Sequence, residues 1–292
     1  MKFLERAFDQ QNQAWKYLLV CVGALFVWMA IGSIPLMLVL FVKAVPIEAL
    51  SKNLSFALLL LPSVVSLFLT VWLVKAWHRR SFAEVVNGTK RVRLDRCLVG
   101  VGVWFVLMTL AYGVDYVVNT EDYVLQFDLP RFIPLLLITF LLIPFQAMYE
   151  EFLFRGYLTQ GLGACMRSRW MALLLPSLVF GLMHASNPEV KEFGFWLTMP
   201  QYIYFGLFFG LVAILDDGIE LSIGLHAANN IFLSLFATHQ SSALQTDAVF
   251  EVVRIDPVKD TCVQVVLSLV ALLYFARKYK WNFRLLNGPI AP

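Results

Sequence analysis

Three short stretches of this sequence place acids, imidazoles and a carboxamide inside otherwise apolar runs. Glu150 and Glu151 are adjacent, His184 is isolated in a second run, and His226 and Asn230 lie four residues apart in a third. An acid at the centre of a membrane helix costs about 2.5–3.5 kcal/mol, so each such group needs a partner or a function. A carboxylate can act as a general base, an imidazole can bind a metal ion or relay a proton, and a carboxamide can donate hydrogen bonds.

Glu150 and Glu151 differ in the residue that lies one helical turn further along on the same face. Glu151 and Arg155 are four residues apart in the favourable order of acid before base, so they share one face of an α-helix. Glu150 points about 100° away from Glu151. We therefore expect Arg155 to hold Glu151 and to leave Glu150 available to a residue on another helix.

Each feature alone has an ordinary structural explanation. Two acids near a helix end often form an interfacial charge cluster, a lone histidine often only packs, and His-x-x-x-Asn occurs by chance. The conjunction on three helices indicates chemistry, because buried ionisable groups gather where a reaction needs them. Other polar residues have simpler interpretations: Asp115 reaches the membrane interface, and His78 and His239 are solvated.

The elements that carry these residues are predicted to be membrane helices. The chain has 292 residues, 60% hydrophobic and 15% charged, whereas soluble domains have about 45–50% apolar and roughly 25% charged residues. A helix needs about 20 apolar residues to cross the bilayer. The sequence therefore predicts an all-α fold, a polytopic bundle with about eight transmembrane helices. The predicted spans are 17–42, 55–74, 97–118, 132–154, 171–187, 195–215, 221–238 and 262–276.

The helices leave no room for a separate soluble domain, so residues 1–292 are expected to form a single transmembrane domain. A net charge of +3 does not indicate nucleic acid as a partner. The four cysteines are scattered singly without metal-finger spacing and are expected to pack as small apolar residues. No feature predicts an oligomeric state.

The basic residues predict how the chain sits in the membrane. Seventeen of the 23 Lys and Arg residues fall on one side of the predicted spans. The positive-inside rule makes that side cytoplasmic, and an even number of helices places both termini there. The compact length without targeting extensions favours a multi-pass protein of a bacterial inner membrane.

Three motifs in this order resemble those of the CPBP family, the CAAX proteases and bacteriocin-processing enzymes also called the Abi family. The motifs are Glu150-Glu151 with Arg155, Phe180 with His184, and His226 with Asn230. The resemblance covers residues 130–240, which it implies to be the catalytic core of the single domain.

The resemblance implies an intramembrane endopeptidase in which Glu150 and His184 activate a water for attack on a peptide carbonyl. His226 and Asn230 would donate hydrogen bonds to the tetrahedral oxyanion, a role open to donors fixed in a dry cavity. The implied supporting residues are Glu151, Arg155 and Phe180. The implied partners are membrane lipid and a membrane-associated peptide or protein, and no motif decides whether that substrate is lipidated.

Alternatives remain beside the metal-free reaction. Members of this family have also been interpreted as metallopeptidases, and Glu150, His184 and His226 are acceptable zinc ligands. We expect no cofactor, because only one carboxylate is free and the sequence reveals no acceptors behind the histidines, which zinc sites use. A non-catalytic membrane scaffold or immunity protein would use the same residues for binding. A proton-coupled transporter is disfavoured because the chain has no internal repeat.

Overall fold

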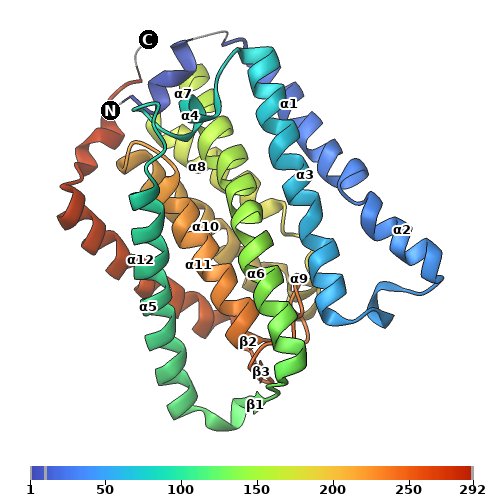
Figure 1. Ribbon diagram of the computed structural model, residues 1–292. Coiled ribbons are helices and arrows are strands. Elements are labelled where there is room, and N and C mark those ends of the chain that lie inside the picture. The colour runs from blue at the N-terminus through green and yellow to red at the C-terminus, as the bar shows by residue number, and fades with distance from the viewer. Residues whose placement is uncertain (1, 10–11, 291–292) are drawn as a thin grey trace.

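The computed structural model describes residues 2–9 and 12–290, and it is a bundle of helices that run roughly along one axis (Figure 1). The α-helices are α1 (Ala14–Phe26), α2 (Ile34–Lys43), α3 (Lys52–His78), α4 (Phe82–Val86), α5 (Leu94–Val118), α6 (Leu129–Glu150), α7 (Thr159–Met166), α8 (Arg169–Leu182), α9 (Pro188–Phe193), α10 (Phe195–Leu215), α11 (Glu220–Phe236) and α12 (Pro257–Tyr279). The π-helical segments are η2 (Val27–Ile31) and η5 (Glu151–Leu158). Short 3-10 helices are η1 (Leu4–Asp9), η3 (Ile47–Ala49), η4 (Thr120–Asp122) and η6 (Phe283–Asn287). The predicted all-α bundle is confirmed.

Six helices within the described residues are long and apolar enough to cross a membrane. They are Ala14–Lys43, Lys52–His78, Leu94–Val118, Leu129–Met166, Phe195–Leu215 and Pro257–Tyr279. All eight predicted segments are helical, but eight spans are not confirmed, because α8 has 14 residues and α11 has 17. Both are shorter than the roughly 20 residues that a span needs. The chain is an integral membrane protein, and one of its two short helices, α11, carries His226 and Asn230.

The predicted span 132–154 proves to be part of a longer helical segment. The π-helical η5 and then α7 continue α6 without a break, so that helical structure extends from Leu129 to Met166. η5 is wider than an α-helix, and such insertions are frequent at functional sites. The residues expected in a loop after Arg155 therefore remain inside the bundle.

The short helix α11 lies inside the bundle, where it packs against α5, α6 and α10. Residues 220–229 are all buried, so no face of its first turns meets lipid. Its first residue, Glu220, accepts a hydrogen bond from Arg93 Nη2 at 2.6 Å. Protein neighbours rather than lipid therefore surround the polar residues of α11, which is where membrane helices tolerate them.

Glycines allow α5 and α11 to approach closely. A Cβ atom at Gly100 would lie 2.6 Å from the carbonyl oxygen of Leu221, and one at Gly224 would overlap the carbonyl oxygen of Cys97. Small residues permit such backbone contact between membrane helices. The depth at which α11 enters the bundle therefore depends on these two positions.

We expect Gly224→Ala to destabilise the protein by about 1–3 kcal/mol or more, because the methyl group must displace backbone rather than a flexible side chain. The measurement is thermal unfolding of the purified protein in detergent. Gly102→Ala is the matched control on α5, since its Cβ would have no neighbour within 4 Å. Equal melting temperatures for the Gly224→Ala and Gly102→Ala proteins would contradict the close approach.

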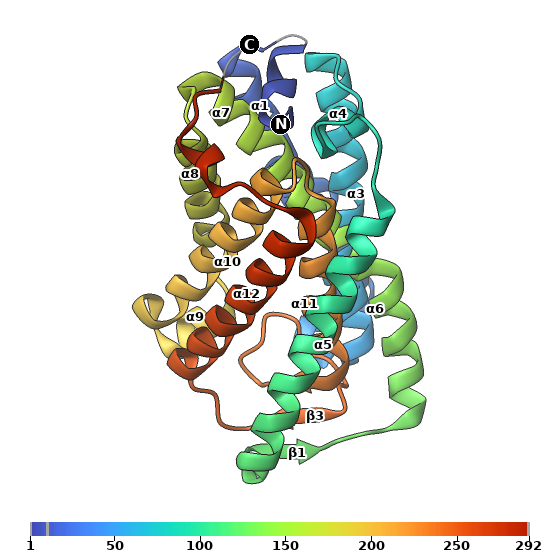
Figure 2. The ribbon, with the colours of Figure 1, turned by 90° about the vertical axis from the view of Figure 1, so that its left-hand side faces the viewer.

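A three-stranded sheet closes the end of the bundle opposite the two termini (Figure 2). The strands are β1 (Tyr123–Leu125), β2 (Ala237–Thr238) and β3 (Phe250–Val252), in the order β1–β3–β2. β1 pairs antiparallel with β3, and β2 pairs parallel with it. Because β2 follows α11 directly and β1 follows α5 through η4, the sheet ties together the ends of these two helices.

Candidate active site

Glu151 and Arg155 form a buried ion pair in η5. Arg155 Nη1 donates to Glu151 Oε1 at 2.9 Å, and the two residues are 1% and 0% exposed. The expected pairing is therefore present, although η5 is a π-helix rather than the α-helix that the prediction assumed. The guanidinium carbon lies 3.9 Å from the centre of the Phe180 ring, which covers the cation.

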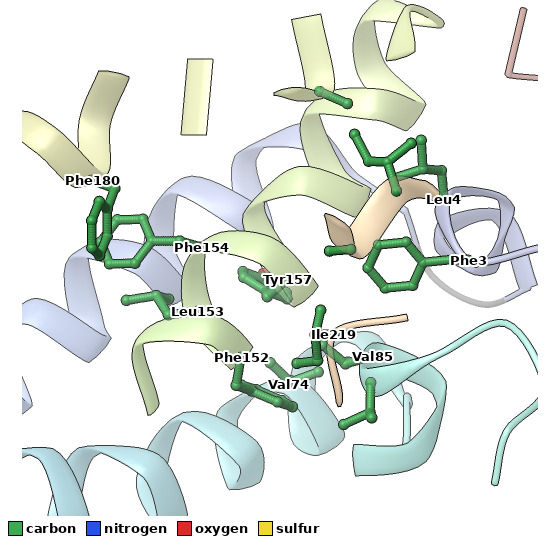
Figure 3. Packing of buried hydrophobic residues seen from close by; sticks show 14 of the residues in the cluster. Phe3, Leu4, Val74, Val85, Phe152, Leu153, Phe154, Tyr157, Phe180 and Ile219 are labelled. Carbon is green, nitrogen blue, oxygen red and sulfur yellow. The ribbon is translucent and has the colours of Figure 1, made fainter. Parts of the chain in front are cut away.

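Apolar side chains of η5 keep the surroundings of this ion pair dry. Phe152, Leu153, Phe154 and Tyr157 belong to one buried cluster, which Figure 3 shows from close by. Phe154 meets Phe180 edge to face, with ring centres 5.4 Å apart. Electrostatic interactions are stronger in such surroundings than in water, so the ion pair can orient its neighbours.

His226 of α11 lies between the two acids. Its Nδ1 is 2.8 Å from Glu151 Oε1, and its Nε2 is 3.7 Å from Glu150 Oε2. The ring also stacks on Phe209 of α10, with centres 5.2 Å apart and planes inclined by 15°. Because a carboxylate can only accept, Nδ1 carries a proton and Nε2 is the atom directed to Glu150. Glu151 thus orients His226 as well as Arg155.

Gln146, which the sequence analysis missed, joins Glu150 to Asn230. Gln146 Nε2 donates to Glu150 Oε1 at 2.6 Å, and Asn230 Nδ2 donates to Gln146 Oε1 at 2.9 Å. The only available signal was a single carboxamide one helical turn before Glu150 in an apolar run. The amide consequently fixes the distance between an acid on α6 and a donor on α11.

Two further residues orient Asn230. Asn229 Nδ2 donates to Asn230 Oδ1 at 3.1 Å, and Trp104 Nε1 of α5 donates to Asn229 Oδ1 at 3.2 Å. Trp104 is fully buried. A continuous hydrogen-bonded chain therefore runs from Trp104 on α5 through α11 to Glu150 at the end of α6. A buried hydrogen-bond network stabilises a fold most when every donor and acceptor in it has a partner.

His184 lies just beyond the end of α8. Its backbone N–H bonds to the Gly181 carbonyl at 2.9 Å, which leaves the Phe180 carbonyl without its usual helical partner. His184 Nδ1 instead donates a hydrogen bond to that carbonyl oxygen, at 2.8 Å. The proton of the neutral imidazole is therefore on Nδ1, and Nε2 presents a lone pair.

Three of the four predicted catalytic residues belong to one polar cluster: Asn230 reaches Glu150 through the Gln146 amide, and His226 Nε2 lies 3.7 Å from the Glu150 carboxylate. Within the described part of the chain, no hydrogen bond or ring contact joins His184 to these three. Phe180 neighbours both imidazoles, with ring centres 4.8 Å from His184 and 6.3 Å from His226. His184 is therefore one aromatic ring removed from the cluster.

The polar residues that the sequence assigned to solvent or interface are less exposed than expected. The prediction for His78 is wrong: it is 0% exposed, and its Nε2 lies 2.7 Å from the Tyr157 hydroxyl. The reason is that α3 extends to His78, so that the ring packs on η5. His239 is half-buried, with its Nδ1 enclosed. Asp115 is half-buried and accepts from Lys259 Nζ at 2.9 Å.

The candidate zinc ligands do not converge on one point. Among the described residues, no group of three or more His, Cys, Asp or Glu side chains could hold a metal ion. Each imidazole does have the acceptor at Nδ1 that zinc-bound histidines use, the Phe180 carbonyl for His184 and the Glu151 carboxylate for His226. The sequence did not reveal these acceptors. Glu150 and His226 lie beside each other, but no contact joins His184 to either of them among the described residues.

Comparisons with known proteins agree with the geometry. The family model described as type II CAAX prenyl endopeptidase Rce1-like matches residues 131–232, a stretch that includes every candidate residue from Gln146 to Asn230. The protein YyaK of Bacillus subtilis (strain 168), described as uncharacterized, is 30% identical over 294 residues, covering 94% of this chain and 96% of the relative. No solved structure matches the chain. Together with its membrane helices and three motifs, these matches show that the chain belongs to the CPBP family, the membrane proteins that include the Rce1-like CAAX prenyl endopeptidases.

Proposed function

We propose that this protein is an intramembrane endopeptidase that hydrolyses a peptide bond of a membrane-associated protein or peptide, with Glu150 as the general base. The observation that carries the proposal is the polar chain that links Asn230, Gln146, Glu150 and His226 within an apolar bundle. The Glu150 side chain is 19% exposed, whereas that of Glu151 is fully enclosed. Only Glu150 therefore combines a restrained carboxylate with access for a water molecule.

Two acceptors would hold the attacking water. One is the Glu150 carboxylate, and the other is the lone pair on Nε2 of His184, whose Nδ1 proton is engaged by the Phe180 carbonyl. The water oxygen would form a bond to the carbonyl carbon as its proton passes to Glu150. When the C–N bond breaks, that proton would pass to the leaving amine, and the products are a carboxylate and an amine.

His226 and Asn230 are proposed as the donors to the oxyanion. Because His226 Nδ1 already donates to Glu151, donation from Nε2 requires a protonated ring. The Glu151 carboxylate stabilises that positive charge, as the aspartate of a catalytic triad does for its histidine. Asn230 uses one amide hydrogen on Gln146 and retains the other for the substrate.

The reaction is proposed to run without a metal ion. We expect cleavage to continue at an unchanged rate after prolonged dialysis against a strong chelator, because Glu150, His184 and His226 do not form a metal-holding group. The measurement compares rates before dialysis, after dialysis and after addition of zinc, together with the metal content of the purified protein. Loss of activity that zinc restores would support the zinc-dependent version instead.

Replacing Gln146 with leucine is expected to lower kcat by about 10–100-fold, because a hydrogen bond to a charged group contributes about 1.5–3 kcal/mol. Without the amide, Glu150 and Asn230 lose the group that joins them. Steady-state kinetics would test this, with exposed Gln245→Leu as the control. An unchanged kcat for Gln146→Leu would show that the Gln146 amide has no part in catalysis.

The remaining features of the proposal concern substrate and location. We propose residues 130–240 as the catalytic core of one transmembrane domain, in a bacterial inner membrane with both termini cytoplasmic. Segments next to the two termini, η1 and η6, lie at the same end of the bundle, which supports the topology (Figure 1). The family match supports a peptide or protein substrate in the membrane, and we propose both lipidated and unmodified proteins as candidates.

The test is a comparison of protein termini in membranes from cells that make either the wild-type or the Glu150→Gln protein. New termini in membrane-associated proteins should appear only with the wild-type protein. Exposed Glu192→Gln, on α9, is the matched control and should reproduce the wild-type termini. Identical termini in all three membranes would favour the non-catalytic scaffold, which protein–protein capture with the Glu150→Gln chain would then examine.

A further inference from the structure

Tyr202 of α10 contacts His184, one of the proposed catalytic residues. Its ring stacks on the His184 imidazole, with centres 4.4 Å apart and planes inclined by 19°. α10 packs along α8, the helix that ends just before His184. The phenol ring is therefore supplied by a neighbouring helix, and the imidazole lies flat against it.

The hydroxyl group of Tyr202 is held as firmly as its ring. It donates to Glu189 Oε1 at 2.7 Å and accepts from Asn187 Nδ2 at 3.0 Å. Asn187 immediately precedes α9, and Glu189 lies in its first turn. Asn187 and Glu189, which follow His184 in the chain, therefore hydrogen-bond to the tyrosine whose ring stacks on the His184 imidazole.

The Tyr202 hydroxyl is the hydrogen-bond donor to the Glu189 carboxylate. Among the described residues, the second carboxylate oxygen of Glu189 is buried and has no hydrogen-bond partner. A buried acceptor left without a donor costs about 1–3 kcal/mol, more if it is charged. The Tyr202 hydroxyl therefore stays on Glu189, and the phenol ring has a fixed orientation.

We propose that Tyr202, with Glu189 and Asn187, is a positioning clamp that fixes the orientation of the His184 imidazole. The clamp keeps His184 Nδ1 on the Phe180 carbonyl and directs the lone pair of Nε2 to the attacking water. This inference rests on the proposed function of His184. A free imidazole can rotate about its side-chain bonds, and misplacement of a catalytic group by about 1 Å can cost 10²-fold in rate.

Kinetics of three variants provide the first measurement. Tyr202→Leu removes the stacking ring and should lower kcat by about 10–100-fold with little change in KM. Tyr202→Phe keeps the ring but loses its anchor and should recover only part of that loss, whereas Glu189→Gln keeps an acceptor for the hydroxyl and should retain most activity. Tyr204→Leu is the matched control on α10, because Tyr204 packs in a different apolar cluster with α12.

Nitrogen NMR of histidine-labelled protein provides a second measurement that needs no cleavage. The His184 signals, assigned with a His184→Gln variant, should show a ring protonated at Nδ1 in the wild-type protein. Tyr202→Leu should give a mixture of the two tautomers, whereas Tyr204→Leu should not. Unchanged His184 signals in Tyr202→Leu would overturn the clamp, whatever happens to kcat. If those signals change as expected while the wild-type protein cleaves nothing, the clamp stands and the peptidase proposal fails.

Discussion

Glu150→Gln is expected to lower kcat by about 10²–10⁴-fold while the protein still folds and inserts. Glutamine has nearly the shape of glutamate and can still accept the hydrogen bond from Gln146 Nε2, which is 2.6 Å long in the wild-type protein. It cannot take a proton from water at neutral pH, and general base catalysis contributes about 10²–10⁴-fold to a rate. The measurement is steady-state cleavage of a peptide taken from a substrate identified by its new terminus.

Two controls separate chemistry from folding in this experiment. The melting temperature of Glu150→Gln in detergent should stay close to that of the wild-type protein, because no packing contact is lost. Glu192→Gln changes the same residue type on the exposed surface of α9 and should keep its kcat. A Glu150→Gln protein that still cleaves at the wild-type rate would exclude Glu150 as the base.

Arg155→Met is expected to destabilise the protein by about 3–5 kcal/mol and to abolish cleavage. The substitution leaves the Glu151 carboxylate, which is 0% exposed, without the cation that lies 2.9 Å away. Removing one partner of a buried ion pair costs about that much, because the remaining charge is uncompensated. Thermal unfolding and kinetics of the same preparation provide the measurement.

The double variant Glu151→Gln/Arg155→Met separates the two consequences. Without either charge, stability should return close to the wild-type value, since a buried ion pair can be replaced by neutral groups of similar size. Activity should stay low, because a neutral amide behind His226 Nδ1 no longer stabilises a positive ring. Recovery of both stability and activity would mean that Glu151 and Arg155 serve the fold alone.

Contacts within one helix could be predicted because they depend on local spacing. Glu151 and Arg155 are four residues apart, and they pair as expected. The same reasoning could not find the second partner of Glu151, since His226 belongs to a helix 75 residues further along the chain. Gln146 was overlooked for the same reason: its role appears only when Asn230 of α11 lies opposite it.

Burial between helices could not be read from periodicity. His78 stands among basic residues and was assigned to solvent, yet η5 covers it. The segment of α11 was predicted as a membrane span, yet it has 17 residues and lies enclosed, because Gly100 and Gly224 allow close backbone contact with α5. These outcomes depend on how neighbouring helices rotate and tilt, which all their side chains decide together.

The sequence by itself determined that the bilayer is the solvent, that the chain folds as helices, and that Glu151 pairs with Arg155. Hydropathy and spacing suffice for these features because they concern the transfer of each segment from water and the neighbours of each residue within one helix. Only the tertiary structure decided that His226 lies between two acids, that Gln146 joins α6 to α11, and that His184 rests on Tyr202. Those contacts form because packing sets the height and the rotation of each helix relative to its neighbours. The sequence of one segment does not determine that packing.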